Sequence, residues 1–567
     1  MSISDLQNQT FIQGVDDPQA SRDEASPSQV LPWLVAGAAT ALTACGGSSD
    51  PSADALAAAR VQPVTDQAAS RFLSQAAWGG NDAAIAQVRA LGYEGWLTRQ
   101  FATLGSQSHF DWMVAKGFYR EDLIFLTSFG LDSSIWRKLM TSPDALRQRI
   151  VLAWSEILVV SMTGLQLPYN GFVGAAYLDV LDKHCFGNFR DLLEAVTLSP
   201  AMGIYLSMMG NQGEDPVTGR MPDENFAREV MQLFTIGLHK LNTDGSPRLN
   251  AQGKPVEAFD QASVMGLAKV FTGWEMAPLS GGVEVARTPM VFNPATHSRS
   301  SKSFLGVTVP AATPGPKALK IALDTLFKHA NVGPFIARQL IQRLVTSNPS
   351  GAYVRRVAAA FNNNGRGVRG DLKAVIKAVL LDSEARSTAL SSTQGKLREP
   401  MVRLVQWART FSVTASRDSW GLGDTSDPAT RLAQSPLHSR SVFNFFRPNF
   451  KPANAILPQP GLVAPEMQIT NEASVTSYLN VMQYVISEPA DDVLPDYSRE
   501  LALADTVPQL VNRCNLLLAA GQLSSATVSV ITTAVASMPA SNAAEKKSRV
   551  CAAVFMTMAV PEYLVLK

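Results

Sequence analysis

Residues 222–238 concentrate the side chains best suited to chemistry. The stretch reads PDENFAREVMQLFTIGL. Asn225, Arg228, Glu229 and Gln232 stand at positions i, i+3, i+4 and i+7, so they would share one face of a helix whose other side is apolar. A stripe that combines an amide, a guanidinium and a carboxylate would serve either a buried polar network or a binding site.

Glu224, Arg228 and Glu229 are the candidate catalytic residues of this helix. Glu224 and Arg228 are four residues apart, so one interpretation is an ordinary helix ion pair. The other is a carboxylate that Arg228 holds in a cleft for acid–base work. Glu224 and Glu229 would point about 140° apart on a helix. A second carboxylate for glycoside chemistry would therefore come from elsewhere, for instance Glu399 or Glu466.

Several polar and aromatic residues are candidates for ligand contacts. Aromatic rings beside Asn, Arg and Glu side chains are typical of sugar-binding clefts, and equally of large helical cores. The predicted binding residues are Asn225, Gln232, Trp274, Asn444, Arg447 and Glu466.

The sequence predicts neither a metal site nor a cofactor. Its six histidines are scattered, with no HExxH spacing, and no Gly-x-Ser-x-Gly motif occurs. The glycine-rich turn at residues 362–371 has no phosphate-binding spacing. We expect Asp371 to cap a helix over residues 372–381, with an anion-binding loop as the alternative.

Composition restricts the function classes. Lys and Arg number 49 against 48 Asp and Glu, without a basic block, which speaks against nucleic-acid binding. An apolar content of 46% supports a substantial core. Cys514 and Cys551 lie in apolar segments near the C-terminus and could form a disulfide or remain two buried thiols.

The N-terminal residues point to export. Residues 31–44 form an apolar run too short to span a membrane, and Leu42-Thr43-Ala44-Cys45 resembles a bacterial lipobox. We therefore expect an export leader over residues 1–45, lipidation of Cys45 and a Ser/Ala/Pro-rich tether over 46–66. The product would be a periplasmic or outer-membrane lipoprotein held by its lipid alone. Residues 1–29 carry one Arg and five acidic residues, so a soluble protein with a disordered N-terminal tail is the alternative.

Helical periodicity dominates the rest of the chain. It predicts helices over residues 68–76, 83–91, 93–101, 145–160, 177–185, 189–197, 225–238, 262–271, 318–329, 334–346, 353–362, 372–381 and 399–411. Turn dipeptides at 244–245 and 252–253 indicate a short β-hairpin excursion within 241–259. The predicted fold class is mainly α, a large multi-helix single domain over residues 67–567.

A colinear series of motifs runs through this domain. In order, its segments are RFLSQAAWG (71–79), LRQR (146–149), HCFGNFR (184–190), PAMG (200–203), the stretch at 222–238, FTGW (271–274), NNNGRGVRGD (362–371), KLREP (396–400), SVFNFFRP (441–448) and APEMQ (464–468). The series resembles the bacterial "domain of unknown function 1800" family.

The resemblance implies an exported bacterial protein, often encoded beside a secreted sulfatase-like protein. It supplies no catalytic residues. Two functions stay open: a hydrolase or lyase acting on an envelope polysaccharide, or a non-catalytic periplasmic assembly or binding protein that works with the sulfatase-like partner. A carbohydrate is a candidate ligand.

Overall fold

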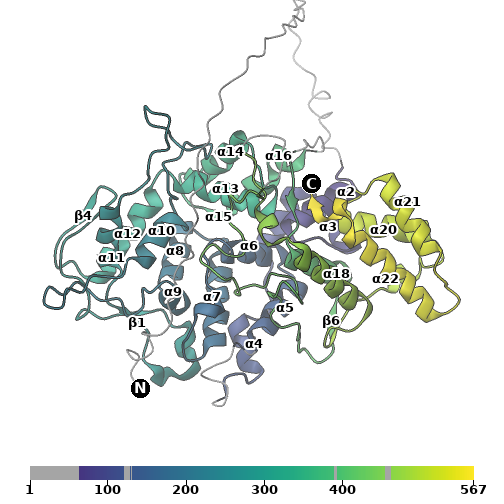
Figure 1. Ribbon diagram of the computed structural model, residues 1–567, viewed down its shortest axis with the longest axis horizontal. Coiled ribbons are helices and arrows are strands. Elements are labelled where there is room, and N and C mark those ends of the chain that lie inside the picture. The colour runs from purple at the N-terminus through teal and green to yellow at the C-terminus, as the bar shows by residue number, and fades with distance from the viewer. Residues whose placement is uncertain (1–62, 121–127, 129, 388–392, 454–460) are drawn as a thin grey trace, which may run out of the picture. The chain divides into compact units, whose positions relative to one another are not determined.

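Helices form most of the regular structure in this computed structural model, which describes residues 63–120, 128, 130–387, 393–453 and 461–567. The predicted leader, Cys45 and most of the predicted tether lie outside the described residues. Residues 63–567 form one compact unit. The prediction of a mainly α fold with small β elements is confirmed (Figure 1).

The first half of the unit is built from helices of 6 to 21 residues. They are α2 (Asp66–Ala76), α3 (Asp82–Ala102), α4 (His109–Ala115), α5 (Leu131–Thr141), α6 (Ala145–Ser155), α7 (Asn170–His184), α8 (Phe189–Thr197), α9 (Pro200–Tyr205), α10 (Asn225–Gln232) and α11 (Gln261–Val270). Three 3-10 helices lie between α-helices in the described residues: Met162–Gly164, Leu279–Arg287 and Pro465–Ile469.

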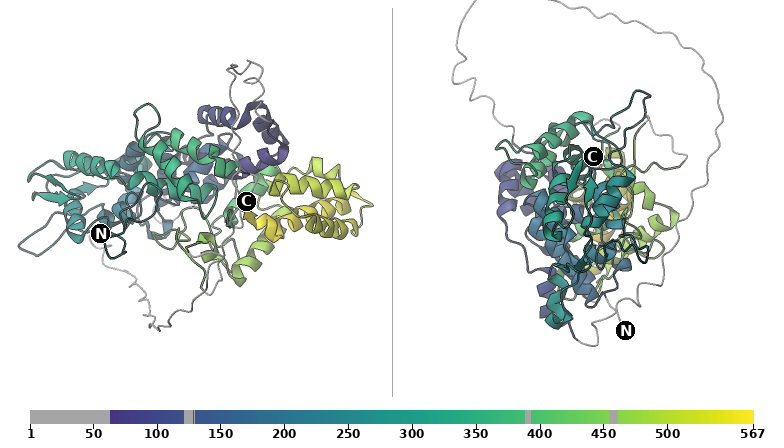
Figure 2. Two further views of the ribbon diagram at one scale, coloured as in Figure 1. Left: turned by 90° about the horizontal axis from the view of Figure 1, so that it is seen from above. Right: turned by 90° about the vertical axis from the view of Figure 1, so that its left-hand side faces the viewer.

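The second half continues the pattern. Its helices are α12 (Gly315–Lys328), α13 (Val332–Leu344), α14 (Gly351–Asn362), α15 (Leu372–Leu381), α16 (Ser383–Arg386), α17 (Pro400–Thr410), α18 (Glu472–Ser487), α19 (Ser498–Leu501), α20 (Val507–Ala519), α21 (Ser525–Ala536), α22 (Ala543–Ala559) and α23 (Pro561–Leu564). Helices α20, α21 and α22 pack side by side and are drawn in yellow (Figure 2). The sequence analysis did not predict α18 or α20–α22.

Capping residues explain why several predicted boundaries are correct. Asn188 and Asp371 accept backbone N–H groups at the starts of α8 and α15, and both helices have the predicted bounds. Asn81 caps α3 in the same way. Gly92, with a φ of 67°, interrupts α3 where the sequence predicts a break between two helices.

The predicted helix over 225–238 is too long at its C-terminal end. Regular α10 ends at Gln232. The N–H groups of Ile236 and Gly237 both bond to the carbonyl of Met231, at 2.9 and 3.0 Å, and Gly237 has a φ of 71°. A glycine in the left-handed region closes the helix before Leu238, which is exposed.

The predicted β excursion forms as short antiparallel bridges and not as regular strands. Turns form at Gly245 and Gly253, and isolated antiparallel bridges join Leu241 to Pro247 and Leu249 to Pro255. Within the described residues, four two-stranded antiparallel sheets lie elsewhere: β1 (Trp274–Glu275) with β2 (Val291–Phe292), β3 (Lys302–Phe304) with β4 (Val307–Val309), β5 (Lys396–Leu397) with β8 (Val565–Leu566), and β6 (Thr414–Ala415) with β7 (Val493–Leu494).

Cys514 and Cys551 do not form a disulfide. Cys514 on α20 and Cys551 on α22 are both buried and free, so of the two alternatives the structure shows two buried thiols.

Among the described residues, no helix has the length and apolar character needed to cross a membrane.

Asp371 provides a test of the capping argument. Its Oδ1 accepts the Ala374 N–H at 3.2 Å and its Oδ2 accepts the Asn364 amide at 2.7 Å. We expect Asp371→Ala to lower the free energy of unfolding by about 1 kcal/mol in urea denaturation. Asp371→Asn retains a capping oxygen and should cost less. Equal losses in the two variants would contradict the cap.

Candidate functional site

Glu224 and Arg228 form an ion pair on the surface. Arg228 Nη2 donates to Glu224 Oε2 at 3.0 Å and to Gln261 Oε1 at 3.0 Å, and Gln261 Nε2 donates to Glu224 Oε2 at 2.8 Å. The side chains of Arg228 and Glu224 are 40% and 33% exposed. The trio ties the start of α10 to α11. An exposed pair of this kind contributes about 0.2–1 kcal/mol.

Glu229 is separated from that pair and buried. Only 8% of the residue is exposed, and its Oε2 has no hydrogen-bond partner among the described residues. Burial raises the pKa of Glu229, and the Arg228 charge opposes the rise. The residues predicted to share one face of the helix therefore lie in different environments: Glu229 packs against the protein interior, whereas the Arg228 side chain reaches the surface. Asn225 and Gln232 are half-buried.

The remaining predicted binding residues do not gather around α10. Trp274 is buried on β1 and Asn444 has a buried amide nitrogen; neither the Trp274 indole N–H nor that nitrogen has a partner among the described residues. Arg447 is exposed and stacks on the ring of Phe443. Within the described part of the chain, no hydrogen bond or ion pair links these three residues to the α10 ion pair.

Glu466 lies instead in a buried cluster of charged side chains. The Lys396 ammonium donates to Glu399 Oε1 at 3.1 Å, lies 3.2 Å from Glu466 Oε1 and bonds to the Arg343 carbonyl at 2.9 Å. Gln434 Nε2 donates to the other oxygen of Glu399 at 2.7 Å. Glu399 is 0% and Glu466 2% exposed.

Two arginines and a third carboxyl group complete this cluster. Arg343 Nε lies 3.1 Å from Glu156 Oε2, and Arg149 Nη2 donates to the Arg343 carbonyl at 2.6 Å. All three side chains are buried. We call these residues, with Lys396, Glu399 and Glu466, the central ionic cluster; it contains three cationic groups and three carboxyl groups.

Glu156 and Glu399 are buried carboxyl groups with opposite pKa shifts. Burial, followed by the charge of Glu399, raises the pKa of Glu156 well above its usual range. Burial also opposes ionisation of Glu399, but the charge of Lys396 and the other groups around it outweigh burial and lower the pKa of Glu399. The two directions favour a neutral Glu156 and an ionised Glu399.

The cluster joins segments that the sequence analysis singled out separately. Arg149 belongs to LRQR, Lys396 and Glu399 to KLREP, and Glu466 to APEMQ. The sequence analysis named Glu399 and Glu466 as partner carboxylates but missed Lys396, Arg343 and Glu156. The only sequence signal that pointed to the cluster was the number of charged residues in those motifs. Because its carboxyl groups are sealed from solvent, the cluster cannot touch a substrate in this conformation.

A groove of about 430 Å³ opens on the described part of the chain. Its walls are the end of α2, the turn at residues 77–81, the start of α3, the end of α5 and the end of α17. Arg409 is the sole charged residue among the described residues that line it; amides and hydroxyls supply the other polar groups. Its size falls in the range of small-molecule sites.

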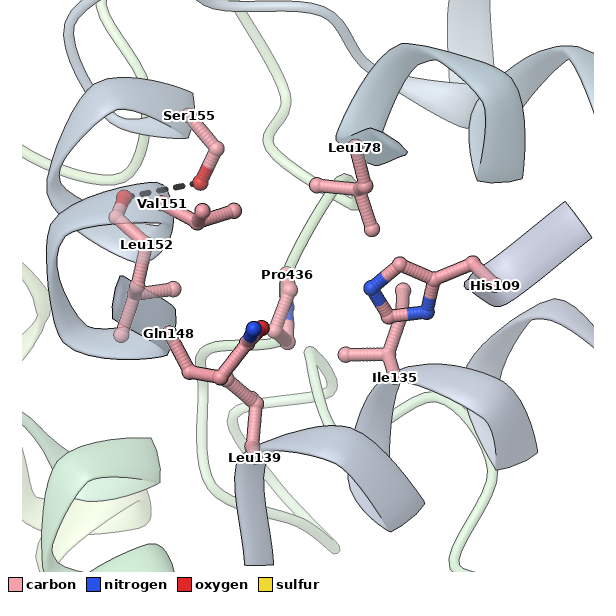
Figure 3. A pocket seen from close by; sticks show the side chains of 9 residues that line it. All are labelled: His109, Ile135, Leu139, Gln148, Val151, Leu152, Ser155, Leu178 and Pro436. Atoms are coloured by element: carbon pink, nitrogen blue, oxygen red, sulfur yellow. Dashed lines mark hydrogen bonds between the residues drawn. The ribbon is translucent and has the colours of Figure 1, made fainter. Parts of the chain in front are cut away.

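A second, enclosed space is much smaller. About 10 Å³ is open between α4, α5, α6 and α7, enough for one water molecule (Figure 3). His109, Gln148 and Ser155 line it, and the Ser155 hydroxyl is already bonded to the Leu152 carbonyl at 2.8 Å. Burial lowers the pKa of His109 well below its usual value, so the imidazole is neutral. This space suits a structural water and not a substrate.

Within the described ranges, no three His, Cys, Asp or Glu side chains are grouped so that they could hold a metal ion.

Comparison with known proteins gives a family and nothing further. A family model described as "Protein of unknown function (DUF1800)" matches residues 71–565. No curated protein and no solved structure matches the chain.

The raised pKa of Glu156 gives the cluster a signature in pH. Because this pKa is higher in the folded than in the unfolded chain, the contribution of Glu156 to stability declines as pH rises above the unfolded value. Glu156→Gln keeps the shape of the side chain but cannot ionise. We expect the free energy of unfolding of this variant, relative to wild type, to improve between pH 6 and pH 9, measured by urea denaturation. An unchanged difference across that range would contradict the raised pKa of Glu156.

Glu399→Gln should destabilise the protein. Removing this carboxylate leaves buried cations uncompensated, and we expect the free energy of unfolding to fall by about 3–5 kcal/mol. Glu224→Gln, the same change in the exposed ion pair, is the control and should cost less than about 1 kcal/mol.

Proposed function

The chain belongs to the DUF1800 family, and from this premise we propose that it is a non-catalytic binding or assembly protein of the bacterial envelope, held at the membrane by a lipid on Cys45. In this proposal it works with a co-encoded, secreted sulfatase-like protein. Its helical unit would act as a rigid body that presents a ligand groove and a partner surface.

One observation carries the proposal: among the described residues that line the groove, Arg409 is the one charged residue and none is a carboxylate. Acid–base hydrolysis of a glycoside needs two carboxyl groups facing the bond that breaks. The carboxyl groups considered as catalysts are elsewhere: Glu224 is ion-paired, and Glu229, Glu399 and Glu466 are buried. A groove with this lining suits binding without turnover.

The lipid anchor can be tested directly. We expect wild-type protein expressed in a bacterial host to incorporate a fatty-acid probe and to sediment with membranes, because Cys45 ends a lipobox-like sequence. Cys45→Ser should lose the label and appear in the soluble fraction. Cys185→Ser, which changes a buried thiol, should keep the label. A mature protein that retains residues 1–44 would contradict the anchor.

A second candidate function rests on Glu229. A buried carboxyl group with an unpartnered oxygen and a raised pKa is a common form of general acid. In this alternative the protein would be a polysaccharide hydrolase or lyase, with Arg228 tuning the acid.

Glu229→Gln separates the two functions. If Glu229 is structural, replacing it by an amide of the same shape should leave pull-down of the sulfatase-like partner and any ligand binding unchanged. If it is a general acid, release of reducing ends or unsaturated products from acidic envelope polysaccharides by the wild type should fall by at least about 100-fold in the variant. Such turnover would overturn the binding proposal.

A further inference from the structure

The groove beside Arg409 has the polar groups of a specific site. Arg409, in the last turn of α17, supplies its charge, and the first turns of α3 supply another part of its lining. Gln87, on α3, lines the groove, is half-buried and makes no hydrogen bond within the described part of the chain. Thr141 and Ser412 add hydroxyl groups at the ends of α5 and α17.

Arg409 is held in place by the protein and keeps donors to spare. Its Nε donates to the Leu139 carbonyl at 2.6 Å and its Nη2 to the Ser142 carbonyl at 3.1 Å, and its guanidinium stacks on the ring of Trp78. Among the described residues, its Nη1 donates no hydrogen bond. Burial lowers the pKa of Arg409 to about 10, so it stays cationic at neutral pH. A fixed guanidinium whose Nη1 is available as a donor is suited to one oxygen of a carboxylate.

The turn that forms the wall is strained. Trp78 has a φ of 63°, which is unfavourable for a residue with a side chain, and Gly79 has a φ of 132°. A Cβ at Gly79 would lie 3.0 Å from Gln406, and one at Gly80 would lie 2.7 Å from the Ala84 Cβ. Strained backbone persists where surrounding structure holds it, and is common at ligand sites. The turn lets α3 begin at the edge of the groove.

We propose that this groove binds a small hydroxylated carboxylate of the sugar-acid type, with its carboxylate on Arg409 and its hydroxyl groups on Gln87, Thr141 and Ser412. The inference rests on the proposed binding function and names its ligand class. No acidic side chain lines the groove in the described residues. The buried Asp144 carboxylate, whose charge acts on Arg409, is itself ion-paired with Arg147, at 3.4 Å. The amide and hydroxyl groups select a hydroxylated partner over a simple organic acid.

Titration with matched sugars tests the proposal. D-glucuronate and D-glucose differ only in a carboxylate at C6. For the full chain, we expect glucuronate to bind at least about tenfold more tightly than glucose, by calorimetry or by the fluorescence of Trp96, which lines the groove, and of Trp78, which stacks on Arg409. No binding of glucuronate to the folded protein, or equal binding of glucose, would overturn the site.

Two variants place the binding in the groove. Gln87→Glu adds a negative charge without changing size or the bonds of Arg409, and should weaken glucuronate binding at least about tenfold. Gln252→Glu makes the same change on an exposed turn outside the groove and should have no effect. Equal affinity in the Gln87 variant would contradict the proposal, even if Arg409→Gln failed to fold.

The outcomes also separate this inference from the proposed function. Failure of glucuronate to bind would remove the ligand class but leave membrane tethering and partner association intact. Conversely, turnover that depends on Glu229 would remove the non-catalytic function while leaving groove binding measurable in the Glu229→Gln variant.

Discussion

The central ionic cluster is the constraint on which the described fold depends most. Arg149, Arg343 and Lys396 come from helices α6 and α13 and strand β5, and they meet three carboxyl groups in a space closed to water. Each charge is tolerable only because the others are in place, since an unpaired buried charge costs several kcal/mol. The cluster therefore fixes how these segments approach one another, and a shift of one would leave the others uncompensated.

A raised pKa on one carboxyl group makes this packing feasible. Three carboxyl groups in one dry space would repel one another if all were ionised. A neutral Glu156 removes part of that repulsion, and Lys396 bridges Glu399 and Glu466. Strand β8 pairs with β5, which carries Lys396 of this cluster. Arg71 Nε donates a hydrogen bond to the Lys567 carbonyl at 2.6 Å, so α2 and the last described residue are in contact.

Function is then left to surfaces that the cluster does not occupy. Its carboxyl groups are perturbed in the way that active-site acids are, but they are sealed and charge-balanced, and buried ion networks shift pKa values for structural reasons as well. The groove beside Arg409 has the opposite character: it is open, carries one cation and no carboxylate, and is bounded by a strained turn. The proposed role in recognition rests on this groove.

The sequence by itself determined the family, the mainly α class and several helix boundaries, because apolar periodicity and caps such as Asp371 act over a few residues. It also identified the motifs that carry Arg149, Lys396, Glu399 and Glu466. Only the tertiary structure decided that these motifs meet in one cluster, and that Glu229 is buried while its neighbour Arg228 is exposed. Contacts between residues hundreds of positions apart, and the side on which a helix packs, depend on the whole fold and leave no local pattern to read.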